Sequence, residues 1–451
     1  MKQEIPTYNM KVVVQETGLK PDTLRAWERR YGVPNPQRTA GGHRLYSQVE
    51  IDMLKWLVAR QGEGMSISHA VELWHQLSDE GVDPTEAYLG SSDSPEAVAP
   101  ISGAQLGQKR EAWINACLAF DEARAQRILA EAFATYPVET VCLELLFQAM
   151  YQIGEGWYQG DVTIQQEHFA SSLALRQLEA LLAAQGSNAR GEKILVANPA
   201  GEQHTFSPLL LSLMMRRRGL DVVYLGANVP LLRMSELLDQ VKPALVLVSA
   251  QTLRTAASLK QMAEYLTGEG YMTLYGGAIF NSVPEIRAAI PGYFLGEDLQ
   301  AAPDAVQRFL QRPPVKMAQH SLPAAYEAAL DEYRSCRADI DAWVLHQLDG
   351  SPWGSIHLAQ ANIDMGDNIE AALQLGNMAF LSESISWVRG LLVNYHFRMP
   401  EVLLRAYMET YQQGCQRIMG RNDGLILDWF VELLRSPEFA LIERGDSMLP
   451  A

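Results

Sequence analysis

The chain has 451 residues, 48% of them hydrophobic and 20% charged, and a formal net charge of −16 at pH 7. This composition is typical of an ordinary globular protein, the length is too great for one hydrophobic core, and the acidic balance argues against nucleic-acid binding by the molecule as a whole. Because no apolar run is long enough to span a bilayer and no basic-apolar leader opens the chain, we expect a cytoplasmic protein without a membrane partner.

The first 60 residues depart from the acidic average, with ten Lys or Arg against six Asp or Glu. A short helix is predicted over 10–16 and a second over 21–31, with Gly18 in the turn between them. A third helix is expected over 47–61. This helix-turn-helix pattern with a basic charge indicates DNA binding by a domain over 1–77.

The second helix is rich in arginine and is followed by a glycine-tipped turn with cations at its base. The string Arg25-Ala-Trp-Glu-Arg-Arg-Tyr-Gly-Val-Pro, then Arg38 and Gly42-His-Arg44-Leu-Tyr46, resembles the MerR family of winged-helix regulators. The resemblance implies a recognition helix in the major groove and a wing that holds the DNA backbone. Arginine can pair bidentately with guanine or phosphate, whereas a solvated basic helix with Trp27 in the core is the alternative. The predicted DNA contacts are Thr23, Arg25, Arg29, Arg30, Tyr31, Arg38, His43, Arg44 and Tyr46.

Residues 78–108 are rich in Ser, Gly, Pro, Asp and Glu, which predicts a flexible linker. Helical periodicity then continues over 109–190 with breaks near Pro137 and at 154–160. About four helices are expected there, packed as a bundle.

The second break in this bundle places three polar or aromatic residues near one another along the chain. Trp157 is expected at the end of one helix, and Glu167 and His168 in the first turns of the next. Taken singly, each residue type is more often structural than functional.

From residue 191 the pattern alternates strand and helix, which predicts a flavodoxin-like, doubly wound parallel sheet over 191–312. Ligands bind such sheets at the carboxyl ends of the strands, and no Gly-x-Gly-x-x-Gly fingerprint favours a dinucleotide. The expected strands are 193–197, 221–225, 244–249, 272–275 and 292–295, with helices over 208–218 and 231–241.

Residues at three of these strand ends resemble the cobalamin-binding domain of methionine synthase and the mutases. That family has Asp-x-His-x-x-Gly, Ser-x-Leu and Gly-Gly motifs, and the resemblance implies that His204 is the lower axial cobalt ligand and that Glu202 orients it. Ser207 departs from the motif glycine, and Gln251-Thr252 from the leucine. A capping histidine in a plain Rossmann-like fold is the alternative. The implied cofactor contacts are Glu202, His204, Ser207, Ser249, Thr252, Gly276 and Gly277.

Over residues 8–310 the chain resembles the CarH/LitR group of adenosylcobalamin-dependent photoreceptors, which carry a Trp-x9-Glu-His motif. The resemblance implies that Trp157 covers the adenosyl group, that Glu167 binds its ribose, and that light disassembles a DNA-binding tetramer. The group has a histidine after the Trp that captures cobalt. Here Tyr158 takes its place, a poorer cobalt ligand than imidazole, and His168 is an imidazole that could approach instead.

Residues 313–323 are expected to form a second linker. Residues 324–451 are expected to form an all-α domain of unknown role, which the architecture of the CarH/LitR group does not include. A helical oligomerisation module is one interpretation, because aromatic residues at helical spacing are usually core. A second sensor pocket for a tetrapyrrole such as a bilin or haem is the other. Its candidate contacts are His346, His357, His396 and Cys415.

The sequence therefore predicts a winged helix-turn-helix, a helical bundle, a flavodoxin-like sheet and a C-terminal all-α domain in one regulator. We expect a cobalamin-dependent, light-responsive transcription factor, with adenosylcobalamin as cofactor and operator DNA and a homodimer or homotetramer as partners. A sensor of cobalamin level without photoresponse is the alternative. A corrinoid enzyme or carrier is disfavoured because no substrate barrel is present.

Overall fold

The computed structural model describes the chain as two compact units. The first holds the described residues up to Met150 together with Glu179–Gly186, and the second holds Tyr151–Leu178 and the described residues from 191 onward. The described residues are 8–17, 19, 21–38, 44–62, 67, 70–71, 74–75, 103–186, 191–312, 322–349, 355–390, 401–436 and 439.

The N-terminal head is a winged helix. Its three strands form an antiparallel sheet in the order β1-β3-β2, and Trp27, which is 6% exposed, packs in the core between the helices. The elements are β1 (Tyr8–Asn9), α1 (Met10–Thr17), α2 (Pro21–Tyr31), β2 (Gln37–Arg38), β3 (Arg44–Tyr46) and α3 (Gln48–Gly62). The predicted helix-turn-helix is confirmed.

The helical segment that follows begins earlier than predicted. Helix α5 starts at Gly103, inside the stretch 78–108 that was expected to be linker. Leu106 and Trp113 are buried seven residues apart, so the apolar face of this helix extends back beyond Lys109. The elements are α5 (Gly103–Leu118), α6 (Glu122–Thr135), α7 (Val138–Thr140), a π-helical segment (Val141–Phe147), α8 (Gln148–Gln159) and α9 (Ile164–Ala184).

The expected turn at 154–160 is wrong in its extent, because α8 remains helical to Gln159. Glycine inside a helix costs roughly 1 kcal/mol relative to alanine, which is why the sequence pattern indicated a break. Here Gly156 lies against the next turn of the chain: a Cβ atom at this position would lie 2.8 Å from Val162 Cγ2. The helix ends at Gly160, whose φ of 83° provides the left-handed residue that commonly follows a helix.

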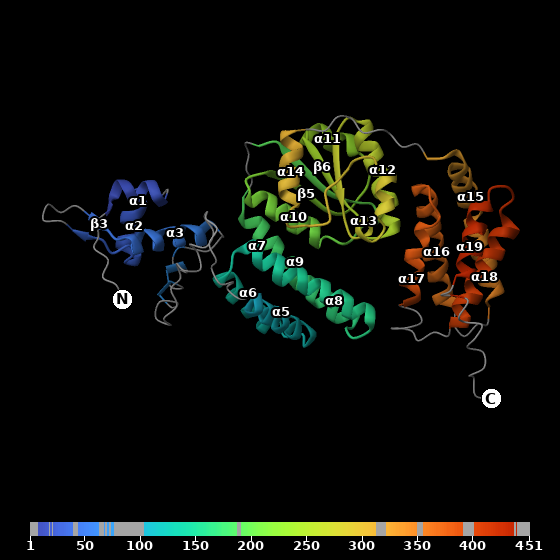
Figure 1. Cartoon of the computed structure of the whole chain (residues 1–451), viewed down its shortest axis with the longest axis horizontal. Coiled ribbons are helices and arrows are strands. Elements are labelled where there is room, and N and C mark those ends of the chain that lie inside the picture. The colour runs from blue at the N-terminus through green and yellow to red at the C-terminus, as the bar shows by residue number, and fades with distance from the viewer. Residues whose placement is uncertain are drawn as a thin grey trace. The chain divides into compact units, whose positions relative to one another are not determined.

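The second unit contains a five-stranded parallel sheet in the order β5-β4-β6-β7-β8, with helices on both faces (Figure 1). Helices α10 and α14 pack on one face and α11 to α13 on the other, and β4 is buried along almost its whole length. The elements are β4 (Lys193–Pro199), α10 (Phe206–Arg217), β5 (Asp221–Val229), α11 (Met234–Val241), β6 (Leu245–Ser249), α12 (Leu253–Gly268), β7 (Met272–Gly276), α13 (Ile279–Ser282), a 3-10 turn (Pro284–Ala289), β8 (Tyr293–Phe294) and α14 (Ala302–Gln311).

This strand order is that of a flavodoxin-like sheet and confirms the predicted fold. The connections reverse direction between β4 and β6, so the loops that follow these two strands diverge. A crevice at such a switch point is the usual ligand site of a doubly wound sheet.

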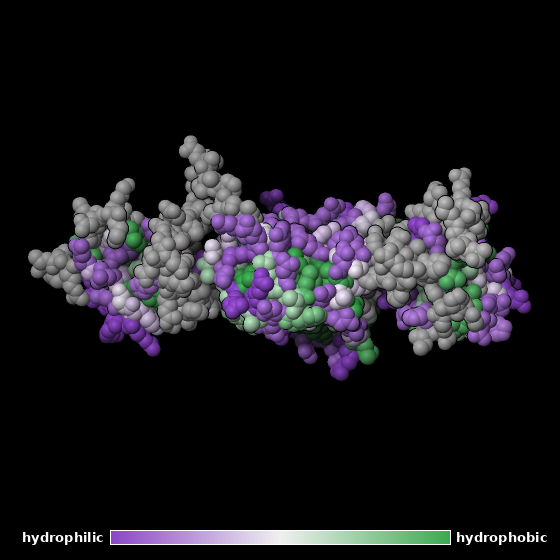
Figure 2. Space-filling model, turned by 90° about the horizontal axis from the view of Figure 1, so that it is seen from below, coloured by the Kyte–Doolittle hydropathy of each residue, from purple (hydrophilic) through white to green (hydrophobic). Residues whose placement is uncertain are grey.

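The C-terminal region is all-helical, as predicted, and its buried core is continuous with the residues on the α12 side of the sheet. The helices are α15 (Ala324–Gln347), α16 (Ser355–Leu375), α17 (Phe380–Arg389), α18 (Glu401–Ile418) and α19 (Gly424–Arg435). Among the described residues, no helix is both long and apolar enough to cross a membrane. Hydrophilic side chains dominate the face drawn in Figure 2, and hydrophobic ones form smaller patches between them.

Candidate functional site

The centre of the candidate site is the pair Glu202 and His204, in the loop after β4. His204 Nδ1 lies 2.7 Å from Glu202 Oε1, and the His204 backbone N–H donates to the same oxygen over 2.8 Å. Glu202 is fully buried, whereas the His204 side chain is 67% exposed. The carboxylate therefore fixes the imidazole through Nδ1 and leaves Nε2 available to a ligand.

The second oxygen of Glu202 is held by the beginning of α12. The Gln251 backbone N–H and the Thr255 hydroxyl each donate to Glu202 Oε2 over 2.7 Å. Burial alone would raise the pKa of Glu202, but the hydrogen bonds from His204, Thr255 and Gln251 lower it below its ordinary value. The group is a charged acceptor with both oxygens occupied.

The Glu202 carboxylate also shifts the pKa of His204. The hydrogen bond with Glu202 raises the pKa of His204 above its ordinary value, although burial acts against it, and the charge of Glu167 contributes in the same direction. Glu167 lies in helix α9, and its carboxylate acts on His204 through its charge. The structure thus brings together two parts of the predicted constellation that are 37 positions apart in sequence.

Two asparagines that the sequence analysis did not identify shape this loop. Asn198 is fully buried, donates to the His204 carbonyl over 3.0 Å and accepts a 2.8 Å hydrogen bond from Ser249 at the end of β6. Asn228 accepts from the Gly201 N–H over 2.8 Å. In the sequence, each asparagine is a polar residue near the end of a run of apolar strand residues. A buried polar side chain at such a position nearly always forms hydrogen bonds, so this pattern could have identified Asn198.

Gly276 and Gly277 end β7, and their environments differ. A Cβ atom at Gly277 would lie 1.9 Å from the Ala250 carbonyl oxygen, and its φ of 125° also requires glycine. A Cβ atom at Gly276 would meet nothing within 4 Å. Gly277 is therefore required by the fold, whereas Gly276 leaves open space beside the strand end.

The other two residues predicted as cofactor contacts on the sheet, Ser207 and Thr252, lie at the beginnings of helices. Ser207 is half-buried in the first turn of α10. Thr252 is the N-cap of α12 and forms a capping box with Thr255. Thr255, which the sequence analysis missed, is thus fixed both by the cap and by Glu202.

On the helical side, Trp157 and Tyr158 are half-buried at the end of α8. Thr163 and Gln166 form reciprocal hydrogen bonds that start α9, and they place Glu167 and His168 in its first turn, as predicted. His168 Nδ1 is 2.7 Å from Glu167 Oε2, and its side chain is 70% exposed.

These residues fit a metal that brings its own equatorial ligands. Among the described residues, no group of three or more His, Cys, Asp or Glu is placed to hold a bare metal ion. A macrocycle-bound metal needs only an axial ligand from the protein, and His204 supplies an imidazole that is oriented by a carboxylate, which is a common arrangement of metal-binding histidines.

In the head, the side chains of Arg25, Arg29 and Arg30 are exposed on α2, and Thr23 and Tyr31 are half-buried on the same helix. Exposed arginines on one helix suit contacts with phosphates and base edges.

The predicted wing contacts are placed differently. Tyr46 is 1% exposed and its hydroxyl lies 3.5 Å from the Met10 sulfur, so the expectation that it holds the DNA backbone does not agree with its position in the core. Arg44 is paired with Glu28 at 2.8 Å. Arg38 lies in the edge strand β2, and His43 lies outside the described residues.

In the C-terminal domain, the described candidate tetrapyrrole contacts differ in burial. Cys415 is fully buried and burial raises its pKa to about 12, whereas the side chains of His346 and His357 are exposed. His396 lies outside the described residues. Tyr333, Tyr411 and the neighbouring aromatic residues form the bundle core.

Three family profiles match the chain. The profile of the MerR HTH family regulatory protein matches residues 8–77, and two B12 binding domain profiles match residues 109–182 and 192–306. Both resemblances inferred from the sequence motifs are confirmed.

Curated proteins similar to this chain include two repressors of Myxococcus xanthus. The chain is 31% identical over 250 residues to the HTH-type transcriptional repressor CarH, covering 55% of this chain and 81% of CarH. It is 30% identical over 261 residues to the HTH-type transcriptional repressor CarA, covering 57% and 81%. Among solved structures, a monomethylamine corrinoid protein of Methanosarcina barkeri is 20% identical with a TM-score of 0.38, covering 46% of this chain and 98% of that protein.

Proposed function

Because the chain belongs to the family of HTH-type transcriptional repressors that includes CarH and CarA, we propose that adenosylcobalamin, bound at the His204 edge of its sheet, makes it a light-responsive regulator. The chain is a cobalamin-binding transcriptional regulator of the MerR type and not an enzyme. Beyond this, we propose that the bound form is adenosylcobalamin, that the protein responds to light, and that DNA binding is controlled through a homodimer or homotetramer.

The observation that carries the proposal is the orientation of His204. Its Nδ1 is occupied by the buried Glu202 carboxylate at 2.7 Å, and its exposed ring faces away from that partner at the switch point of the sheet. His204 would hold cobalt from below. Gly276 leaves open space at the neighbouring strand end, where the displaced nucleotide tail of the cofactor would pass.

Trp157 and Glu167 would hold the upper side. When bound, adenosylcobalamin supplies a cobalt–carbon bond that light breaks. The Trp157 indole excludes water from that side, and Glu167 accepts hydrogen bonds from ligand hydroxyl groups. His168 Nδ1 lies 2.7 Å from Glu167 and keeps its carboxylate in place.

The proposed signal is a change in how α8 and α9 pack against the sheet. Contacts of Trp157 and Glu167 with the bound ligand would favour one arrangement, and the loss of those contacts would favour another. If subunit contacts depend on this arrangement, the oligomer dissociates. Linked DNA contacts are then lost, and affinity falls much more than any single contact would explain.

The decisive experiment compares the full chain, loaded with adenosylcobalamin, in darkness and after green light. Size-exclusion chromatography measures the oligomer, and a gel-shift assay uses a duplex selected from random sequence with the dark protein. We expect a larger species in the dark and at least tenfold weaker DNA binding after illumination. Unchanged size and affinity would contradict the photoresponse, and binding that follows cobalamin concentration but not light would indicate a cobalamin-level sensor.

A further inference from the structure

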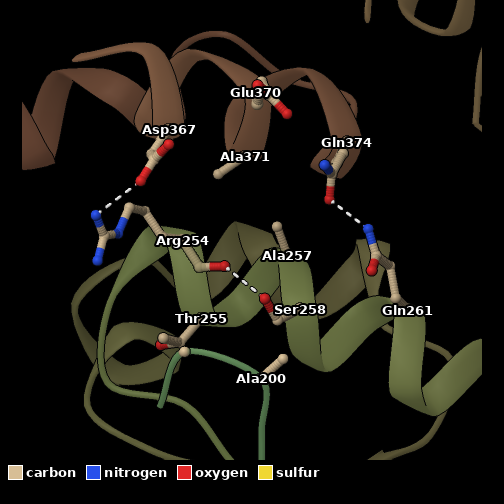
Figure 3. A pocket seen from close by; sticks show the side chains of 11 residues that line it. Ala200, Arg254, Thr255, Ala257, Ser258, Gln261, Asp367, Glu370, Ala371 and Gln374 are labelled. Carbon is tan, nitrogen blue, oxygen red and sulfur yellow. Dashed lines mark hydrogen bonds and ion pairs between the residues drawn. The ribbon is translucent and has the colours of Figure 1, made fainter. Parts of the chain in front are cut away.

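The C-terminal bundle contacts the sheet through a seam between α12 and α16. Arg254 Nη1 lies 2.9 Å from Asp367 Oδ2, and Gln261 Nε2 donates to Gln374 Oε1 over 3.0 Å (Figure 3). Both pairs join residues that are 113 positions apart, so the two helices run in the same direction and in register over two turns. Such a matched register indicates a specific helix pairing.

Small residues lie between the two polar pairs. Ala257 and Ser258 on α12 face Ala371 on α16, and with the polar pairs they line a cavity of about 240 Å³ (Figure 3). The spacing on each helix is that of one helical face, at i, i+3, i+4 and i+7. Interfaces between domains of one chain are commonly more polar than obligate interfaces, and the two polar pairs of this seam agree with that pattern.

On the bundle side, the seam is tied to the core of the C-terminal domain. Arg337 Nη2 lies 2.7 Å from Asp367 Oδ1, and its Nη1 lies 2.7 Å from Glu370 Oε1. Arg337 also lies 3.8 Å from Asp341, which accepts a hydrogen bond from the buried Tyr411 over 3.2 Å. Asp367 is therefore held by a side chain that also contacts the core of the bundle.

On the sheet side, the seam reaches the axial-ligand loop. Arg254 is in the first turn of α12, next to Thr255, whose hydroxyl holds the Glu202 carboxylate over 2.7 Å. Glu202 in turn orients His204. Arg254 therefore contacts the bundle, and Thr255 in the same helical turn contacts the candidate cofactor site.

A second contact joins the bundle to α8. Gly390, directly after α17, packs against Tyr158: a Cβ atom at Gly390 would lie 1.9 Å from Tyr158 Oη. Tyr158 follows Trp157 at the end of α8. The bundle therefore contacts both α8 and α12. The cofactor is proposed to bind between α8 and the sheet against which α12 packs.

We propose that the C-terminal bundle is a strap across the cobalamin site, joined to α8 through Gly390 and to α12 through the Arg254–Asp367 pair, and that a change in the separation of these helices is transmitted to the bundle. Arg254 and Gly390 act as positioning residues. This inference rests on the proposed binding of cobalamin between α8 and the sheet, and it gives the C-terminal domain a part in sensing.

Hydrogen exchange of the unmodified full chain tests the strap directly. Peptides from α16 and α17 are followed without cofactor, with adenosylcobalamin in darkness, and after illumination. We expect the exchange rates of these peptides to change at least threefold on cofactor binding, together with those of the His204 loop. If the absorption spectrum reports bound cobalamin and the α16 and α17 peptides do not respond, the strap is contradicted and the proposed function stands. If cobalamin does not bind at all, the proposed function itself fails.

A pair of glycine substitutions makes the test specific. Gly390→Ala places a methyl group against Tyr158, whereas Gly424→Ala, also in the bundle, meets nothing within 4 Å. We expect Gly390→Ala to raise exchange in α17 and to weaken adenosylcobalamin binding about twofold to fivefold, while Gly424→Ala changes neither. Equal behaviour of two folded variants would overturn the role of Gly390.

The seam is tested in the same way with Arg254→Gln, and Arg308→Gln, at an exposed arginine of helix α14, serves as the control with the same change in charge. Exposed ion pairs contribute up to about a fivefold effect. We expect Arg254→Gln to weaken cobalamin binding and to alter the His-ligated cobalamin spectrum. An unchanged spectrum and affinity, with the exchange of α16 also unchanged, would show that the seam does not act on the site.

Discussion

Thr255 donates its hydroxyl hydrogen to the buried Glu202 carboxylate over 2.7 Å, although 53 residues separate the two in the chain. The contact joins the first turn of α12 to the loop after β4. It makes the orientation of His204 depend on a helix that carries no ligand itself.

Replacing Thr255 by valine keeps the shape of the side chain and removes this donor. A buried acceptor that loses a partner costs roughly 1–3 kcal/mol, so we expect urea unfolding to show a loss of about that size. We also expect the His-ligated cobalamin spectrum to weaken. Thr267→Val is the matched control on the same helix, because that hydroxyl donates only to helix carbonyls. Equal stability losses in the two variants would argue against a special role for the Thr255 contact.

His204→Ala removes the imidazole that we propose as the lower ligand. The variant should still fold, since the side chain is largely exposed, but cobalamin bound to it should lack the spectrum of histidine ligation. His168→Ala, in which the other exposed imidazole of the site is removed, should retain that spectrum in the dark. Absorption spectra of the loaded proteins decide the matter, and an unaltered spectrum for His204→Ala would mean that another group ligates cobalt.

Gly276, the last residue of β7, and Gly277, which follows it, should respond differently to the same change. Gly277→Ala forces a side chain into the Ala250 backbone and into an unfavourable φ, so we expect a loss of about 3 kcal/mol or more in unfolding free energy. Gly276→Ala should leave stability nearly unchanged, because its surroundings are open. If the nucleotide tail passes there, Gly276→Ala should weaken binding of cobalamin but not of cobinamide, which lacks the tail. Equal weakening for both ligands would place the tail elsewhere.

The fold was predictable where buried patterns dominate. The five strands lie within a few residues of their expected positions, because short apolar runs between turn signals favour buried strands in an α/β chain. The exception is β5, which continues to Val229. The turn predicted at 154–160 was wrong because α8 continues through Gly154 and Gly156, and of these two glycines Gly156 lies against Val162. Tertiary contacts of that kind leave no periodic signal.

The candidate site was predictable only in part, and for a related reason. Glu202 and His204 stand two positions apart after a strand, so a local motif contains them. Asn198 and Thr255 hold the same loop through contacts that span six and 53 residues. Only the fold brings such partners together, and neither residue type is unusual at its position.

For DNA binding, the exposed face of α2 leads to a prediction about salt dependence. Arg29→Ala removes one exposed cation from this helix, so we expect weaker binding to the selected duplex and a salt slope reduced by about one. Lys109→Ala is the control, because Lys109 lies in α5 and is paired with Glu131 at 2.8 Å. Gel-shift titrations at several salt concentrations measure both. The same loss in slope for the two variants would show that the effect is one of net charge and not of contact.

The photoproduct depends on what stands beside Trp157. Tyr158 offers a phenol, a poorer cobalt ligand than imidazole, and its hydroxyl is packed against Gly390. We expect illuminated wild-type protein to lack a stable cobalt species with two imidazole ligands. Tyr158→His should permit one, because it would add an imidazole at the end of α8, beside Trp157 on the proposed upper side of the site. Tyr158→Phe, which removes the hydroxyl without supplying a nitrogen ligand, is the control and should resemble the wild type. Absorption spectra after green light distinguish the cases, and indistinguishable photoproducts from all three proteins would mean that position 158 does not reach the cobalt.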